Sequence, residues 1–409
     1  MTERRVPHPV VWTLLYFPFG ALGGFVSVAL TFLATRHGLS ISEGSLLQGA
    51  QLLSQWLKWS WAPLIDVTLT PKRWYVIATA ASAVGIFAMS AVPLSPDGLW
   101  LLLGIIALAS LVNSVVGMSI EAIMASVTPP DQLGRTSAWF QAGNLGGSGV
   151  GGGLGLMLIQ HLPEPWMAGA ILGSIFMACS VFLLFLPDVE STHKGKPILS
   201  AFRGVFDDIR ALAKTRGGLL AAWLCFLPVG TGAGQGALTQ AKVAEYWGAG
   251  DTEVAWVQGF LAAFVTAAGC FVGGWVCDRM HPRTAYAGIG VGLAVVGIGM
   301  AVTPPSVAGY IAWNLTYALV VGLAYAAFTA VVLEAIGARS AATKYNLFAS
   351  LSNFPIWWLG LLLGRVADLR GPVAMLVTEA SLALIGVGLF FAARSGITRT
   401  SLPDRLVEA

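Results

Sequence analysis

YFPFG at residues 16–20 and FLPVG at residues 226–230 are two copies of one short pattern, about 210 residues apart in a chain of 409 residues. Other residues repeat at nearly the same separation. The matched pairs are Gly38 with Gly248, Gln48 with Gln258, Asp66 with Asp278, Glu121 with Glu334, and Asn144 with Asn353. A repeat of this length indicates two halves that share one order of elements.

Each half contains about six apolar stretches of the roughly 20 residues that cross a bilayer. The stretches are 10–35, 44–65, 74–93, 99–125, 136–160 and 166–186, then 217–241, 252–276, 283–303, 307–335, 343–366 and 372–393. We predict an all-α integral membrane protein with twelve transmembrane helices in two pseudo-symmetric six-helix halves. In secondary transporters such halves enclose a substrate site near the bilayer midplane.

The predicted halves, residues 1–187 and 217–409, are joined by a polar linker, residues 188–216. Apolar linker residues recur at helical spacing, and they are Ile198, Phe202, Val205, Phe206, Ile209 and Leu212. This spacing predicts an amphipathic helix on the inner membrane face. A solvated tether between the halves is the alternative, and the two can coexist.

Composition agrees with a membrane protein, since 56% of the residues are apolar and only 11% are charged, against about 25% charged in soluble domains. The net charge of +3 without a basic stripe argues against a nucleic-acid partner.

The five histidines fall in loops or tails, so no metal site is predicted. No cofactor motif or nucleophile–base pair is visible, so we expect a transporter and not an enzyme. We expect a monomer.

Most of the 23 lysine and arginine residues fall on the side that carries both termini and the linker. The positive-inside rule therefore places both termini in the cytoplasm. The alanine- and glycine-rich composition suggests a bacterial inner membrane as the location.

Polar side chains within membrane spans usually face a cavity or the bundle interior. In the second span, Gln48, Gln51, Gln55 and Lys58 share one helical face, which we assign to a substrate cavity. Further candidate substrate-binding residues are Asn113, Gln141, Asn144, Gln235, Asn314, Tyr317, Asn353 and Trp357. For any single amide, an interhelical hydrogen bond is an equally good interpretation.

Lys58 has the highest cost of insertion, since an ammonium at the centre of a membrane helix costs about 2.5–3.5 kcal/mol. We expect it to serve as an anion site or to pair with an acid on a facing helix. The alternative is that its long side chain reaches the interface.

Acidic residues in the spans are candidates for proton coupling or gating. Glu121 and Glu334 either carry protons or form a gate with Arg135, Arg339 or Lys344. Glu379 is either a proton carrier or part of a local hydrogen-bonded pair. At the inner ends of the spans, two groups are expected to hold the halves together. They are Asp66 with Lys72 and Arg73, and Asp278 and Arg279 with Arg283. This set is termed the inner latch.

Two glycine and proline patterns carry structural predictions. Proline at Pro18 and Pro228 should break or bend the first and seventh spans beside the cavity. The glycine run between Gly143 and Gly155 predicts close helix packing.

LKWSWAPLIDV at residues 57–67, followed by Lys72-Arg73-Trp74, resembles the K-F-x-W-A-P-L-x-D-R signature of the muropeptide permease and acetyl-coenzyme A transporter group. EAIMASVTPPDQLGR (121–135) and GGGLGLMLI (151–159) resemble other stretches of that group, which belongs to the major facilitator superfamily. The likeness is specific over the first five spans and is superfamily-level over the second half. Siderophore permeases share the signature and the compact length.

The resemblance implies a proton-driven inner-membrane importer in which Lys58, Asp66 and Glu121 hold the group's polar signature positions. Val67 replaces the usual arginine after the aspartate, and Glu121 replaces the commoner aspartate. The inner latch of the first half is therefore expected to depend on Lys72 and Arg73.

The function predicted from these observations is alternating-access import of a medium-sized polar solute of the muropeptide or siderophore type, coupled to protons. The expected partners are this small molecule, the proton and the lipid bilayer. The alternatives are an exporter, a carrier of acyl-coenzyme A, or a transporter-like sensor without flux. A coenzyme A group should require several cavity cations, and only Lys58 is visible.

Overall fold

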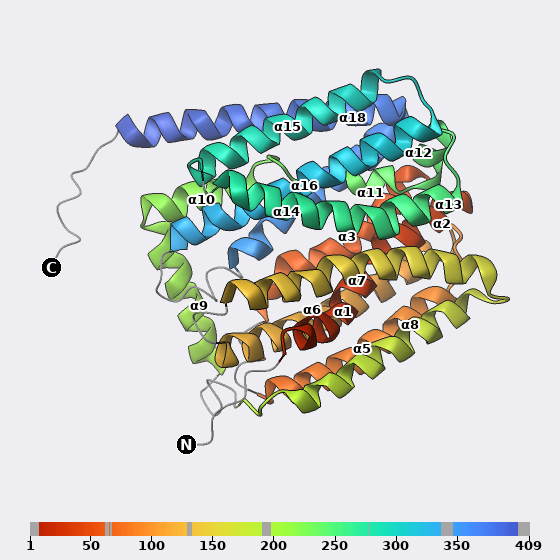
Figure 1. The fold of residues 1–409 in the computed structure, drawn as a ribbon, viewed down its shortest axis with the longest axis horizontal. Helices are drawn as coiled ribbons and strands as arrows, with labels where there is room; N and C mark the ends of the chain where they lie inside the picture. The colour runs from red at the N-terminus through yellow and green to blue at the C-terminus, as the bar shows by residue number, and fades with distance from the viewer. Residues whose placement is uncertain are drawn as a thin grey trace.

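The computed structural model describes residues 8–61, 65, 68–128, 133–189, 198–277, 279–336 and 347–399. Within these residues the regular elements are all helices. Figure 1 shows them running roughly side by side, with the elements up to α8 in the lower part and those from α10 onward in the upper part. Helix α9 (Ile198–Ala213) spans both groups at one end of the bundle.

The first half contains six membrane segments in the predicted order. Their elements are α1 (Val10–Gly24), η1 (Phe25–Leu30) and α2 (Thr31–Arg36), then α3 (Ile41–Leu57) with η2 (Lys58–Ser60), α5 (Pro71–Ala91), α6 (Leu99–Val127), α7 (Leu133–His161), and α8 (Pro165–Cys179) with η4 (Ser180–Phe185). Helix α3 begins at a capping box in which Ser40 and Glu43 bond to each other's backbone amides, an arrangement that favours helix initiation.

The second half repeats this order. Its elements are α10 (Arg216–Phe226), α11 (Gln235–Leu238) and α12 (Ala241–Tyr246), then α13 (Asp251–Val254), η5 (Ala255–Leu261) and α14 (Ala262–Cys277), α15 (Pro282–Val302), α16 (Val307–Ile336) and α18 (Asn353–Arg399). Helix α18 contains the eleventh and twelfth segments, separated at Gly371, where φ is 84°.

By length and apolar composition alone, 8 helical stretches among the described residues suffice to cross a membrane, and the stretch at Leu347–Ala393 contains two segments. The other predicted segments correspond to α3, α7 and the interrupted series α10 to α12. These three segments lack the length or the mean hydropathy of the other eight stretches. Helix α3 is short and has a polar face, α7 is rich in glycine, and the seventh segment is divided. The two six-helix halves of the prediction are therefore present.

The two proline patterns behave differently. The seventh segment leaves the helix after Phe226, and Gly230 and Gly232 adopt left-handed φ values of 62° and 63°. The expectation of a break at Pro18 is wrong, because α1 continues through it. A methyl group on Gly20 or Gly24 would overlap the backbone of α7, so α1 packs closely against α7 at both positions.

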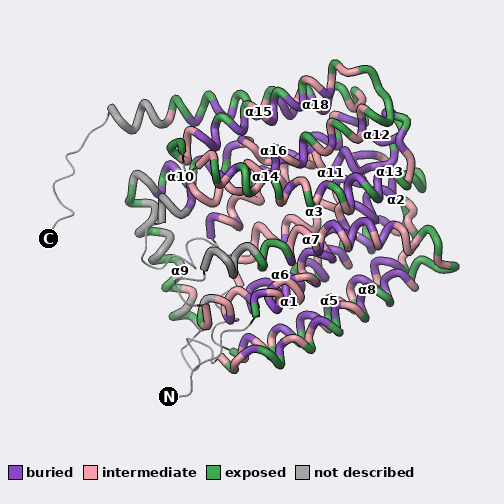
Figure 2. The backbone as a smooth tube through the Cα atoms, viewed as in Figure 1, coloured by how far each residue is buried: buried purple, intermediate pink, exposed green. Residues whose placement is uncertain are grey.

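The glycine run of α7 provides that packing. A Cβ atom on Gly143, Gly147 or Gly151 would overlap the backbone of α1, which confirms the predicted close approach. Figure 2 shows buried residues concentrated between the helices and exposed ones on the outer faces. Many exposed side chains are large and apolar, among them Trp100, Phe271 and Leu184, as expected for a surface covered by lipid.

The predicted linker helix is present as α9. Apolar Leu199 and Phe206 are exposed along it, as are charged Arg203 and Asp207. Its position on the membrane surface and the boundaries of the halves at 187 and 217 stay predictions.

Candidate functional site

A charged pair lies inside the first half. The Nζ atom of Lys58, at the end of α3, is 4.0 Å from Oε1 of Glu121 in α6, and the two side chains are only 12% and 19% exposed. The hydroxyl of Tyr16 in α1 donates a hydrogen bond to the same Oε1 at 3.2 Å. Mutual pairing offsets part of the cost of holding both charges away from water.

Glu121 has one carboxylate oxygen left over. Its Oε2 atom is buried and has no hydrogen-bond partner among the described residues. Gly117, one turn before Glu121, leaves space for the Tyr16 ring, because a Cβ there would lie 3.3 Å from the Tyr16 hydroxyl. The side chain of Arg135, one of the predicted partners of Glu121, lies outside the described residues, as do Arg339 and Lys344.

The glutamines that precede Lys58 on α3 contact segments of both halves. The amide of Gln48 lies directly over Gly236 of α11, where a Cβ atom would overlap it. Gln51 approaches Gly23 of α1 with its Nε2 atom, and its buried Oε1 has no partner among the described residues. Gln55 is half-buried one turn from Lys58.

Aromatic rings join α3 to α18 next to this stripe. Trp56 and Trp357 are stacked, with ring centroids 6.0 Å apart and an interplanar angle of 10°. Phe354 packs against Trp56 at 5.0 Å. The predicted residue Trp357 thus contacts α3 at Trp56 and near Gly49, about 100° around the helix from Gln48 and Gln55.

Several predicted amides make bonds between neighbouring helices or turns. Buried Asn113 donates to the carbonyl of Phe19 in α1 at 3.0 Å, and buried Asn314 accepts a hydrogen bond from the Gln258 amide of η5 at 2.5 Å. These contacts match the interhelical alternative, and a role of either residue in substrate binding stays a prediction. The remaining predicted amides are Asn144, which donates to Gln141; Asn353, which donates to the carbonyl of Ala349; and Gln235, which is half-buried at the start of α11.

Glu379 is 4% exposed and holds the interrupted part of the seventh segment. Its Oε1 atom accepts hydrogen bonds from the Tyr317 hydroxyl at 2.7 Å and from the backbone amide of Gly234 at 2.9 Å. A backbone that leaves the helix inside a membrane needs such partners. The local hydrogen-bonded pair considered for Glu379 therefore exists, and it includes the predicted residue Tyr317.

The two halves are joined by hydrogen bonds at the end of the bundle opposite α9. Thr239 donates to the carbonyl of Ser27, Gln240 donates to Ser45, and the amide of Ala241 donates to Thr35, at 3.0, 3.1 and 2.8 Å. Further bonds there run from Lys242 to the Leu39 carbonyl, from Arg36 to Glu245, and from the amides of Ile41 and Ser42 to Asp368. We term these contacts the closed end.

Side chains in the closed end are packed as well as bonded. Leu39, Ala244 and Trp247 are each 1% exposed or less. Toward the opposite end, by contrast, the polar residues Gln141 and Tyr325 are exposed, the latter at 51%.

The inner latch is only partly within the described residues. Asp66 and Asp278 lie outside them, as do the side chains of Arg135 and Glu334. Arg279 folds back on its own helix, where its guanidinium stacks over Trp275 at 4.0 Å. Arg73 is exposed at the first turn of α5. Closure by the inner latch stays a prediction.

Sequence reasoning missed Tyr16, Asp368 and the bonded residues between Thr239 and Lys242. Tyr16 belongs to the first proline pattern, but Phe226 occupies its place in the second copy, so the repeat gave no signal. Asp368 lies in a loop-like stretch of the sequence between Arg365 and Arg370 and has no counterpart in the repeat pairs, so no sequence pattern pointed to its contact with the other half.

The fold and this site define a multi-pass membrane transporter with a polar interior. The chain matches the description of the Major Facilitator Superfamily over residues 12–356, and it belongs to that family. Members are secondary transporters of small molecules, so the protein is a transporter and not an enzyme.

Solved structures support the same fold. A nucleoside transporter, NupG, is similar with a TM-score of 0.68 and 12% identity, over 94% of this chain and 98% of that one. A bacterial homologue of the human lysosomal transporter Spinster, described as inward-facing and unoccupied, gives 0.69 and 17%, over 97% and 98%. A POT family transporter in complex with a thioalcohol-conjugated peptide gives 0.71 and 10%, over 95% and 96%.

Proposed function

We propose that the protein imports a medium-sized polar solute across the bacterial inner membrane, driven by protons, with Glu121 as the proton carrier and Lys58 as its switchable partner. The observation that carries this proposal is the half-buried Lys58–Glu121 pair. Among the described residues, hydrogen bonds join the two halves at the closed end, and near the Lys58 end of α3 the halves meet through apolar packing of Trp59 against the cluster that contains Phe348. We assign the closed end to the outside and α9 to the cytoplasm, as the positive-inside rule favours. The conformation is then inward-facing.

Protonation of Glu121 changes what Lys58 can bind. A proton arriving on the unpartnered Oε2 atom neutralises the carboxyl group, and the attraction that holds the Lys58 ammonium is lost. Lys58 is then available for an acidic group of the substrate. When the substrate leaves toward the cytoplasm, the proton follows, and the ion pair seen in this conformation forms again.

The surrounding side chains favour a solute with amide or hydroxyl groups and a ring or sugar face. Gln48, Gln51 and Gln55 supply both hydrogen-bond donors and acceptors, and Trp357 supplies an apolar face. A cell-wall sugar–peptide fragment has sugar rings, amides and carboxylates, and an aromatic siderophore has a similar mixture. We rank the muropeptide type first because residues 57–67 resemble the signature of that group.

The first experiment measures anhydro-muropeptides in spent medium from a deletion strain by mass spectrometry. We expect them to accumulate in the medium, and we expect the wild-type gene to restore low levels. Lys58→Ala and Glu121→Gln should fail to restore them at normal abundance in the membrane. Glu164→Gln is the matched control, since it makes the same change in an exposed loop.

Two outcomes would contradict the proposal in different ways. Normal uptake by both variants would remove Lys58 and Glu121 from the site. Unchanged muropeptide levels in the deletion strain would remove that substrate, and siderophore uptake under iron limitation would then be measured. The same flux can be measured in proteoliposomes with an imposed pH gradient. Solute movement from the cytoplasmic face to the outer face would show an exporter. Absence of flux with every solute tested would favour a sensor.

A further inference from the structure

A groove opens on the outer surface of the first half, between the start of α5 and the end of η4. It has a volume of about 900 Å³ and is lined by Leu69, Lys72, Arg73, Val76, Ile77, Ser180, Leu183, Leu184, Leu186, Pro187 and Asp188. Figure 1 shows α5 and α8 along the lower edge of the bundle, away from the second half. The groove is therefore separate from the Lys58–Glu121 site and faces the surroundings of the protein.

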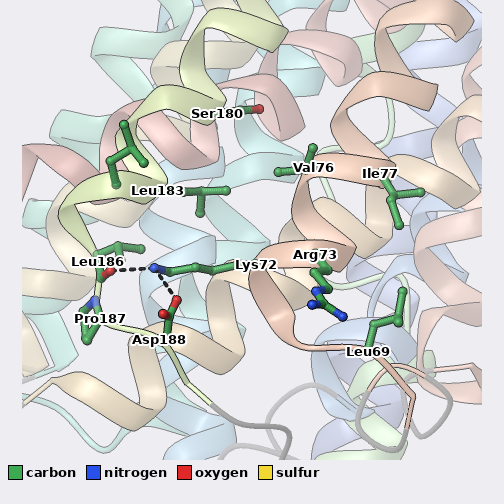
Figure 3. Close-up of a pocket in the computed structure, with 11 residues that line it drawn as sticks. Leu69, Lys72, Arg73, Val76, Ile77, Ser180, Leu183, Leu186, Pro187 and Asp188 are labelled. Carbon is green, nitrogen blue, oxygen red and sulfur yellow. Dashed lines mark hydrogen bonds and ion pairs between the residues drawn. The ribbon is translucent and has the colours of Figure 1, made fainter.

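One end of the groove is cationic. The Lys72 ammonium donates to the Leu186 carbonyl at 2.7 Å and pairs with Asp188 at 2.8 Å. Arg73 is exposed, and Figure 3 shows its guanidinium extending beside Leu69, away from the Lys72–Asp188 pair. Asp188 pairs with Lys72, and among the described residues that line the groove no second acid is present to balance Arg73; Asp66, its predicted latch partner, lies outside the described residues.

The rest of the groove is apolar and open. Val76, Ile77 and Leu184 are 42%, 52% and 82% exposed. They lie within about one helical turn of the charged residues, so a ligand that covers the groove has an anionic end joined to an apolar part. A soluble anion would meet only the charged end and leave this wall uncovered.

The internal repeat shows that the second cation is not demanded by the fold. Pro71-Lys72-Arg73 at the start of α5 corresponds to Pro282-Arg283-Thr284 at the start of α15. Both helices start with proline followed by one cation. The first half adds Arg73, which lines the groove, whereas Thr284 holds the corresponding place in the second half.

We propose that this groove binds one anionic phospholipid, with the phosphate at Arg73 and Lys72 and an acyl chain along Val76, Ile77 and Leu184. Basic pockets between membrane helices near the interface recognise anionic headgroups, and the exposed apolar wall supplies the hydrophobic part of the binding free energy. The assignment to the cytoplasmic leaflet rests on the proposed orientation, whereas the lipid chemistry rests only on the groove.

The experiment uses the full-length protein, purified in a neutral detergent and delipidated. Added dioleoyl phosphatidylglycerol should bind and raise the unfolding temperature more than dioleoyl phosphatidylcholine at equal concentration. Native mass spectrometry would show one tightly retained lipid. Arg73→Gln should weaken phosphatidylglycerol binding about fivefold, the contribution of one cation near an anionic headgroup.

Two control variants separate the parts of the groove. Arg283→Gln makes the same charge change at the corresponding turn of α15 and should leave binding unchanged. Val76→Phe keeps the charges and fills the apolar wall, and it should weaken binding of phosphatidylglycerol and of phosphatidylcholine alike. Because binding is measured without transport, failure here and failure of the proposed import are separate results.

Three results would overturn the proposal. One is equal affinity for the two lipids in the wild-type protein. Another is equal loss of phosphatidylglycerol binding in Arg73→Gln and Arg283→Gln, which would indicate unspecific attraction to basic residues. The third is stabilisation by inorganic phosphate equal to that by phosphatidylglycerol, together with no effect of Val76→Phe, which would indicate a site for a soluble anion.

Discussion

The carboxylate of Asp368 accepts a hydrogen bond from the backbone amide of Ile41 at 2.8 Å, and its second oxygen accepts one from the next amide at 2.6 Å. Ile41 is the first residue of α3 in the first half, whereas Asp368 belongs to α18 in the second. An acid from one half thus binds the N-terminus of a helix in the other, where unpaired amides and the helix dipole favour negative charge. This contact belongs to the closed end.

Asp368→Asn should weaken the closed end, because hydrogen bonds to a charged acceptor contribute about 1.5–3 kcal/mol. The predicted result is a shift toward conformations open at that end. A cysteine introduced at Gln48 should react faster with a membrane-impermeant maleimide added outside. Asp97→Asn, in an exposed loop of the first half, is the control. An unchanged reaction rate would mean that Asp368 does not hold the two halves together.

Glu379 offers a test between its two predicted roles. Glu379→Leu leaves the Tyr317 hydroxyl and the Gly234 amide unpaired, and a buried unpaired group costs about 1–3 kcal/mol. The unfolding temperature of Glu379→Leu should therefore fall below that of the wild type. Glu379→Gln keeps an acceptor oxygen, so its unfolding temperature should be close to that of the wild type.

The transport of Glu379→Gln then decides whether the residue carries protons. Normal proton-driven uptake would assign Glu379 to holding the interrupted seventh segment. Loss of proton-driven uptake with retained solute exchange would instead make it a proton carrier.

The glycines of α7 allow a matched stability test. Gly151→Ala places a methyl group on the backbone of α1 near Ala21, and overpacking of this kind costs about 1–3 kcal/mol. Gly146→Ala on the same helix meets nothing within 4 Å and should be neutral or stabilising, since alanine favours helix. Equal unfolding temperatures for the two variants would mean that α1 and α7 are not closely packed.

The Lys72–Asp188 pair predicts a dependence on pH. The hydrogen bond from Lys72 and its charge lower the pKa of Asp188. A depressed pKa means that the contribution to stability is present above the pKa of the unfolded chain, about 3.9. It is lost as the pH falls through the lower folded value.

The unfolding temperature of the wild type should therefore exceed that of Asp188→Asn by a constant amount from pH 7 to about pH 5, and the difference should then shrink and disappear once the pH is below the lowered folded pKa of Asp188. Because Asp188 is exposed, the difference should be small and should shrink with added salt. A difference that grows as the pH falls would contradict this assignment.

Part of the candidate site followed from the chain alone. The expectation that Lys58 pairs with an acid on a facing helix matches its contact with Glu121, because an isolated charge is too costly in a membrane. The third member, Tyr16, was invisible, since a tyrosine in an apolar helix is most often a packing residue. The choice between cavity and interhelical bond for Asn113 was equally open, because helical periodicity gives the face of a helix but not its neighbour.

The two-half membrane architecture, the order of the segments and the interruption after Phe226 could all be predicted from the amino-acid sequence. These features depend on apolar length, repeat spacing and the chemistry of proline and glycine, all of which act locally along the chain. Only the tertiary structure decided that Asp368 binds the start of α3, that Glu379 holds Gly234, and that α1 stays continuous through Pro18. Those outcomes depend on which helices are neighbours and on how closely their backbones approach, and local pattern does not encode either.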